Sequence, residues 1–147
     1  MKTGIDLYGV LKDRKDVFAA LRSLKALGYD RIEPCVAPGP FEGLEHVLWP
    51  EAWLREHLAE IREMGFEMES VHLVGWNTAT QRGRLRDLAA DCGFRHLVVK
   101  SPVELTETSL HQAALEYMML ADALAEVGAE ALIHNESADI ETRVRGK

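Results

Sequence analysis

The same order of apolar and polar positions occurs four times along the chain. In each copy, an amphipathic stretch with helical spacing is followed by a glycine, one or a few polar positions and a short apolar run. A glycine at this position is typical of the left-handed residue that follows the end of a helix. The copies predict successive helix–strand units. They read LRSLKALGYDRIEP, LAEIREMGFEMESVHL, LRDLAADCGFRHLVVK and LADALAEVGAEALIHN, with Gly28, Gly65, Gly93 and Gly128 at the helix ends.

The spacing of the apolar residues also predicts which face of each helix is buried. Intervals of three and four residues keep side chains on one stripe of a helix. Pro50 and Glu51 favour the first turn of the second helix, and Ser109 with Gln112 resembles a capping box. The predicted stripes are Val17, Leu21, Leu24 and Leu27 in the first helix, and Leu110, Ala113, Tyr117, Leu120, Leu124 and Val127 in the last.

Short runs rich in apolar residues predict five strands, Gly4–Tyr8, Arg31–Glu33, Met68–Leu73, His96–Lys100 and Ala131–His134. Strands that alternate with helices form right-handed βαβ units and a parallel sheet. Units of about thirty residues match a TIM (β/α)8 barrel, which has about 250 residues for eight units. A doubly wound sheet more often has a Gly-rich loop after its first strand, and LYGVLKDRKD has a single glycine. We therefore expect residues 1–147 to form one partial α/β barrel domain of about five strands and four helices, with the strands in chain order, the helices outside and the last three βα units lacking.

Composition and charge narrow the classes of function. With 147 residues, 47% hydrophobic and 28% charged, the chain has the composition of an ordinary soluble globular domain. Its net charge of -7 disfavours nucleic acid as a partner, because phosphate binding requires a basic surface. No run approaches the roughly 20 apolar residues of a membrane helix, and the N-terminus lacks the features of a signal peptide. The two cysteines, Cys35 and Cys92, form no disulfide framework, so we expect a reducing cytoplasm.

Every predicted strand ends in side chains that can take part in chemistry. In parallel α/β barrels, the carboxyl ends of the strands form the active site. The alternative is that strand ends meet solvent and are polar for that reason alone, which is enough to explain any one of them. The complete set favours a functional site, and it consists of Asp6, Tyr8, Glu33, His72, Lys100, His134, Asn135 and Glu136.

The segments GIDLYGV, LGYDRIEP, SVHL, GFRHLVVK and ALIHNE, in this order and spacing, resemble the sugar phosphate isomerase/epimerase family of xylose-isomerase-like TIM barrels. The resemblance covers nearly the whole chain. It implies a divalent metal ion (Mn, Mg, Co or Zn) at the carboxyl mouth of the barrel and a small polyol, sugar or keto-acid substrate. It also implies proton transfer next to a carbonyl, which needs a base and a positive centre that holds the enolate oxygen.

The resemblance further implies roles for the strand-end residues. His134 matches a strand-five position where relatives have a glutamate ligand or a His-Asn-His triplet. Here the triplet is His-Asn-Glu, so Glu136 is the second expected ligand and Glu141 its alternative. His72 matches a substrate-contacting histidine. The expected sets are catalytic Glu33, His72 and Lys100, substrate-binding Tyr8, Trp76 and Asn135, and metal-binding His134 and Glu136.

Several of these residues also have a purely structural explanation. His72 can be a core histidine bonded to the backbone, and Lys100 can be a solvated loop charge. Glu33 can brace the barrel through an ion pair, and Trp76 can cover the core as readily as it can stack on a sugar. Cys35 is expected to be a small buried hydrophobe.

The expected barrel lacks strands six to eight, which supply the remaining metal ligands of the family. Because a catalytic metal needs three or more protein ligands, we expect metal binding by this chain alone to be weak. A partial barrel also leaves two sheet edges unpaired and its inner face open. We therefore expect a homo-oligomer, which would cover apolar strand residues such as Ile5, Leu7, Val71, Leu73, Val98 and Ile133.

Three functions stay open from the sequence. The first is a sugar or sugar-phosphate isomerase or epimerase, inactive or incomplete as this chain alone. The second is a metal-dependent phosphodiesterase of the endonuclease IV type, which shares the barrel but is disfavoured by the acidic charge and the lack of a histidine-rich cluster. A DNA-cleavage assay with zinc separates these two. The third is a non-catalytic half-barrel that assembles or binds a ligand, for which self-association without turnover is expected.

Overall fold

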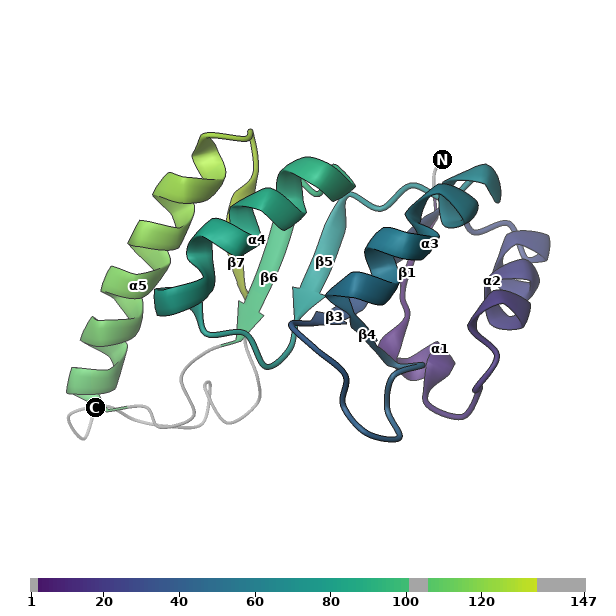
Figure 1. Ribbon diagram of the computed structural model, residues 1–147, viewed down its shortest axis with the longest axis horizontal. Helices are drawn as coiled ribbons and strands as arrows, with labels where there is room; N and C mark the ends of the chain where they lie inside the picture. The colour runs from purple at the N-terminus through teal and green to yellow at the C-terminus, as the bar shows by residue number, and fades with distance from the viewer. Residues whose placement is uncertain (1–2, 101–105, 135–147) are drawn as a thin grey trace.

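The computed structural model describes residues 3–100 and 106–134, which form parallel strands and helices in alternation. In chain order, the elements are β1 (Gly4–Asp6), α1 (Tyr8–Leu11), α2 (Val17–Ala26), β2 (Arg31–Glu33), β3 (Cys35–Ala37), β4 (Leu48–Pro50), α3 (Glu51–Glu63), β5 (Ser70–Leu73), α4 (Thr78–Cys92), β6 (His96–Lys100), α5 (Glu107–Ala125) and β7 (Glu130–His134). Figure 1 shows α3, α4 and α5 on one side of the strands. The alternation and the helices on one face agree with the predicted part of a barrel.

The strand order confirms the predicted parallel pairing in chain order, with one interruption. β1 pairs with β2, and β3 pairs with β5, which is followed by β6 and β7. The predicted second strand, Arg31–Glu33, is β2. Pro34, which has no backbone N–H, separates it from β3, and the strands form a two-stranded and a five-stranded sheet. The two sheets remain adjacent, because the Ile32 N–H donates to the Glu67 carbonyl (3.1 Å) and the His72 N–H donates to the Pro34 carbonyl (2.9 Å).

Strand β4, like β3, has no counterpart among the strands predicted from the sequence. It pairs in parallel with β3, where Cys35 lies opposite Leu48. The chain leaves β1 after Asp6 and enters α1 at Tyr8, and the Asp6 carboxylate accepts a hydrogen bond from the Tyr8 N–H (2.9 Å) at this turn. β1 is therefore shorter than expected. β4 lies beside β3, the strand that follows β2 in the chain. A three-residue run directly before a helix is too short to show a strand period.

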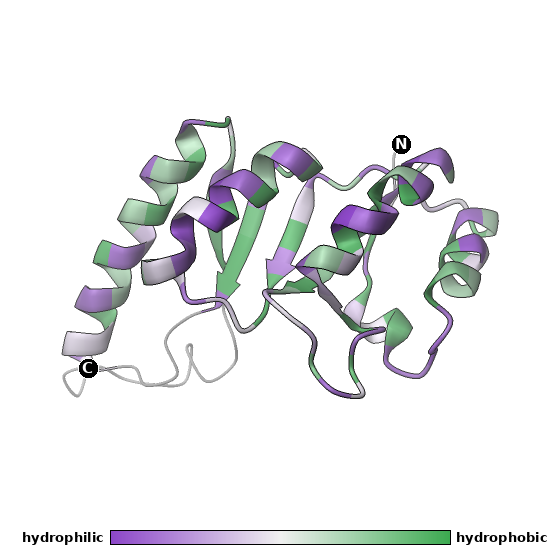
Figure 2. Ribbon diagram, in the orientation of Figure 1, coloured by the Kyte–Doolittle hydropathy of each residue, from purple (hydrophilic) through white to green (hydrophobic). Residues whose placement is uncertain are grey.

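The two faces of the sheet differ in polarity, because successive side chains of a strand point to opposite faces. Figure 2 shows hydrophobic residues along β6 and mixed colours along α3 and α4. The side chains of β5 and β6 that face the helices are buried and apolar, namely Val71, Leu73, Leu97 and Val99. The alternate positions on the open face are mostly polar, namely Ser70, His72, His96 and Lys100, with Val98 between the last two.

The expectation that the open face would expose apolar strand residues is therefore wrong for most of the residues named. Leu7 and Val71 are 0% exposed and Leu73 is 4% exposed, because they belong to the core between strands and helices. Ile5 packs against the same core. Ile133 in β7 does meet water, with 55% of its surface exposed.

The predicted helix stripes are buried in their centres but not at their ends. Leu120 and Leu124 of α5 are 0% exposed, whereas Leu110 is 38% exposed. Leu27 is 75% exposed because α2 ends one residue earlier, at Ala26. The predicted left-handed glycines are confirmed, since φ lies between 70° and 89° at Gly28, Gly65, Gly93 and Gly128.

The N-terminus of α5 differs from the prediction by one turn. Its cap is Thr106, whose side chain accepts a hydrogen bond from the Ser109 N–H (3.1 Å). Ser109 is the third helical residue of this capping box and not its cap. Gln112 instead donates to Glu116 along the helix (2.8 Å). Within the described ranges, no helix has the length and apolar character needed to cross a membrane.

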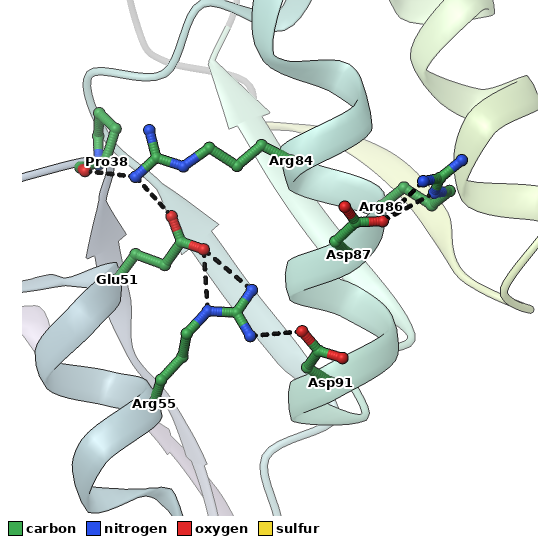
Figure 3. A network of polar contacts seen from close by, with 7 residues as sticks. All are labelled: Pro38, Glu51, Arg55, Arg84, Arg86, Asp87 and Asp91. Carbon is green, nitrogen blue, oxygen red and sulfur yellow. Dashed lines mark hydrogen bonds and ion pairs between the residues drawn. The ribbon is translucent and has the colours of Figure 1, made fainter.

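A buried carboxylate joins α3 to α4, as Figure 3 shows. Glu51, at the start of α3, is 6% exposed, and its Oε1 lies 2.9 Å from Arg55 Nη2. Its Oε2 lies 2.7 Å from Arg84 Nη2, which also donates to the Pro38 carbonyl (2.7 Å). Arg55 reaches further along α4 to Asp91. The network fixes these two helices against the loop after β3.

Candidate active site

A cavity of about 430 Å³ lies at the carboxyl ends of the strands. Strands and loops that are far apart in the sequence meet here, because parallel neighbours end on the same side of a sheet. Four of the residues expected in the site line this cavity, namely the expected substrate-binding Tyr8, the expected catalytic His72 and Lys100, and the expected metal ligand His134. The remaining lining residues are Asp6, Cys35, Leu48 and Val74.

Three potential metal ligands from three strands lie together at one side of the cavity. Asp6 ends β1, Cys35 begins β3, and His72 lies in β5 directly opposite Cys35 in the strand register. One ligand atom from each, a carboxylate oxygen, the sulfur and an imidazole nitrogen, lies within 4.8 Å of the others. Asp6 is exposed, Cys35 is buried and His72 is half-buried, so the group bridges the core and the cavity.

The two cavity histidines lie beside each other. The ring centroids of His72 and His134 are 4.8 Å apart, with an angle of 54° between the ring planes. Burial lowers the pKa of His72 below its ordinary value, and proximity to His134 lowers it further, against the opposing effects of Glu33 and Asp6. Because the ordinary value is 6.5, His72 is a neutral imidazole at neutral pH. A neutral imidazole can accept a proton or bind a metal ion.

Cys35 is buried, as expected, and it also borders the cavity. It is 2% exposed, and burial raises the pKa of its thiol to about 12, with smaller contributions in the same direction from Asp6 and Glu33. The thiol is therefore protonated at neutral pH. Its sulfur nevertheless lies beside a carboxylate and an imidazole. The sequence did not indicate this arrangement, because nothing in the spacing of Cys35 relates it to Asp6 or His72.

Glu33 lies next to this cavity and not in its wall. It pairs in register with Asp6 and lines a neighbouring hollow of about 390 Å³ that also includes Asp6, Arg31 and Ser70. The Glu33 carboxylate accepts a hydrogen bond from the Ser70 hydroxyl. Its charge still affects the pKa values of Cys35 and His72, so it contributes to the potential of the site.

Trp76 lies away from the cavity, where it covers the core. Its indole N–H donates to the Val36 carbonyl (2.9 Å), and the Arg84 guanidinium carbon lies 5.1 Å from its ring centroid. These contacts agree with the alternative stated from the sequence, in which Trp76 covers the core and does not stack on a sugar. Asn135, Glu136 and Glu141 lie outside the described residues.

The donor atoms of Asp6, Cys35 and His72 suit a divalent metal ion. Zinc in particular binds carboxylate oxygen, thiolate sulfur and imidazole nitrogen, and a catalytic zinc has three protein ligands and one open position. Tetrahedral coordination requires ligand atoms about 3.5 Å apart. The observed limit of 4.8 Å leaves a side-chain adjustment of about an ångström, and the backbone of Cys35 already lies opposite that of His72. The residues present therefore fit the metal that the fold family implies.

The sequence matches no protein-family model and no curated protein. Solved structures do match it in fold. One is a sugar phosphate isomerase/epimerase from Parabacteroides distasonis, with a TM-score of 0.78 and 15% identity over 99% of this chain and 55% of the other. Another is the IolI protein with a bound zinc atom, with a TM-score of 0.61 and 13% identity over 90% of this chain and 51% of the other.

A third similar structure is the probable 3-DHS dehydratase AsbF of Bacillus anthracis, involved in petrobactin synthesis, with a TM-score of 0.58 and 12% identity over 95% of this chain and 54% of the other. The chain thus spans about half the length of each solved structure that it matches. The described part of the chain has the α/β fold of about half of each of these structures, which agrees with the partial barrel that the sequence predicted.

Proposed function

We propose that this chain carries part of the active site of a sugar or sugar-phosphate isomerase or epimerase, which transfers a proton next to a carbonyl. The observation that carries the proposal is the cavity at the carboxyl ends of the strands, where two imidazoles, an ammonium group and a carboxylate meet. These polar groups of the lining can bind the hydroxyl and carbonyl oxygens of a small polyol, sugar or keto-acid. The solved structures with the same fold include a sugar phosphate isomerase/epimerase, which supports this class of substrate.

The lining residues divide into two groups by position. Asp6, Cys35 and His72 form the compact ligand group, and a metal ion bound there supplies positive charge for an enolate oxygen. His134 and Lys100 lie on the neighbouring strands, directly opposite each other in the register of β6 and β7. We assign proton transfer to His134 and charge neutralisation to Lys100. This exchanges the roles that the sequence suggested for the two histidines, because His72 has the other ligand atoms around it.

Tyr8 completes this arrangement at the start of α1. Its side chain is half exposed (50%) and lines the same cavity, so its hydroxyl is available to a substrate hydroxyl. The two unpaired, buried cysteines agree with the proposed cytoplasmic location, where thiols stay reduced.

The experiment measures the partial reaction rather than full turnover. The full chain is incubated in D2O with a panel of aldoses, ketoses, their phosphates and small keto-acids, with Mn, Mg, Co or Zn added, and exchange of the proton next to the carbonyl is followed by NMR. Exchange that is lost in His134→Ala and retained in His111→Ala, a histidine of α5, is the expected result. A folded chain that exchanges no substrate of the panel with any of these metals would refute the proposal.

A further inference from the structure

We propose that Asp6, Cys35 and His72 form a zinc site with a thiolate ligand, complete within this chain and open toward the cavity at the strand ends. This zinc site would be the metal centre of the proposed isomerase or epimerase, and the role of the metal rests on that proposed function. Zinc binding is measured without substrate, so the two proposals can fail separately. The site also differs from the expected one, in which His134 and Glu136 were the ligands and binding was weak.

The backbone places all three ligands in advance. Cys35 and His72 face each other across the β3–β5 pair, and hydrogen bonds from the His72 N–H to Pro34 and from the Val74 N–H to Val36 fix that register on both sides. The carboxylate of Asp6 is oriented by the hydrogen bond that it accepts from the Tyr8 N–H. Binding zinc then requires side-chain rotation and no rearrangement of the sheet.

The donor set selects the metal. Magnesium and calcium prefer oxygen ligands, whereas a set of sulfur, nitrogen and oxygen favours zinc. When zinc binds, the Cys35 S–H bond breaks, a zinc–sulfur bond forms and the proton leaves to the solvent. The fourth position faces the cavity of about 430 Å³, where a water molecule or a substrate oxygen has room to bind.

Cobalt and zinc alone are the probes. A cobalt–thiolate bond gives intense near-ultraviolet absorption, which carboxylate and imidazole ligands do not produce. We expect this absorption and one zinc ion per chain in the wild type, and loss of both in Cys35→Ser. The matched control is Cys92→Ser, since Cys92 is equally buried (1% exposed) but lies in α4, away from the cavity. Circular dichroism of each variant checks that it is folded.

The histidines supply the second pair of variants. His72→Ala should lose zinc, and His134→Ala should retain it, although both imidazoles line the same cavity. Absence of zinc binding by the folded wild type would overturn the proposal, as would zinc binding retained in Cys35→Ser or His72→Ala. Loss of zinc in His134→Ala would overturn the three-ligand set. None of these zinc-binding results decides whether the chain exchanges protons with another metal present, which the isomerase assay measures.

Discussion

At the scale of single residues, two ionisable side chains, His72 and Glu51, are wholly or partly buried. The pKa of His72 lies below its ordinary value, because the ring is half-buried and lies beside His134. Glu51 is 6% exposed, and two guanidinium groups, those of Arg55 and Arg84, approach its oxygens. Both side chains also contact a residue from a distant part of the chain, His134 in the case of His72 and Arg84 in the case of Glu51.

The lowered pKa of His72 makes stability depend on pH in a defined direction. In the unfolded chain the imidazole takes up a proton near its ordinary pKa of 6.5, and in the folded chain only at lower pH. The unfolded state thus binds more protons between these two values, and the free energy of unfolding should fall as the pH is lowered below 6.5. Urea unfolding at several pH values measures the slope. His72→Gln should reduce it, whereas His111→Gln on α5 should not; equal slopes in both variants would contradict this account.

Removal of the Glu51 charge should destabilise the fold. In Glu51→Gln, Arg55 and Arg84 lose the carboxylate between them, and we expect a loss of about 1–3 kcal/mol, a range kept modest because both arginines are partly exposed. Thermal or urea unfolding measures it. Glu56→Gln, an exposed position of the same helix, should change stability by less than about 0.5 kcal/mol. A loss no larger than that of the control would show that the network adds nothing.

At the scale of elements, helix ends carry local hydrogen bonds that can be tested separately from the core. Asp16 caps α2, and its carboxylate accepts a hydrogen bond from the Ala19 N–H (2.9 Å). Asp16→Ala leaves that N–H without its side-chain acceptor and should lower the free energy of unfolding by about 1 kcal/mol. Asp13→Ala removes the same charge three residues earlier in the chain, outside the helix. Similar losses in both variants would mean that charge, and not capping, is responsible.

At the scale of the whole molecule, the last helix and strand expose apolar side chains that nothing in the described part of the chain covers. Met118 is 65% exposed and Ile133 is 55% exposed, and Leu115 and Met119 each exceed 40%. β7 pairs with β6 on one edge, so its other edge offers backbone groups for pairing. We propose that a second copy of the chain covers this surface, which spans α5 and β7.

The self-association follows from burial of apolar surface and should respond to charge placed within it. Sedimentation velocity at micromolar concentration is expected to show a homo-oligomer. Ile133→Lys and Met118→Lys should shift it toward the monomer. Leu27→Lys changes a still more exposed residue (75% exposed) after α2, and it should leave the association unchanged. A wild-type monomer over this concentration range would disprove the proposal.

The repeated helix–glycine–strand pattern was sufficient to predict the parallel order of the strands and the helix-terminal glycines. These features depend on local periodicity and on the rule that βαβ connections are right-handed. The same reasoning missed α1, β3 and β4 and misplaced the cap of α5. These are features of three or four residues, and no period can be read from so short a stretch.

The polarity of the open face and the ligand group could be found only from the tertiary structure. Alternation along β5 indicates that His72 and Leu73 face opposite sides, but not which side the helices cover. Asp6, Cys35 and His72 are separated by long stretches of sequence, and their ligand atoms meet because β3, which follows β2 after Pro34, pairs with β5 so that Cys35 lies opposite His72. Periodicity describes neighbours within one element, whereas a metal site depends on the register between elements, which is determined by packing and backbone hydrogen bonds.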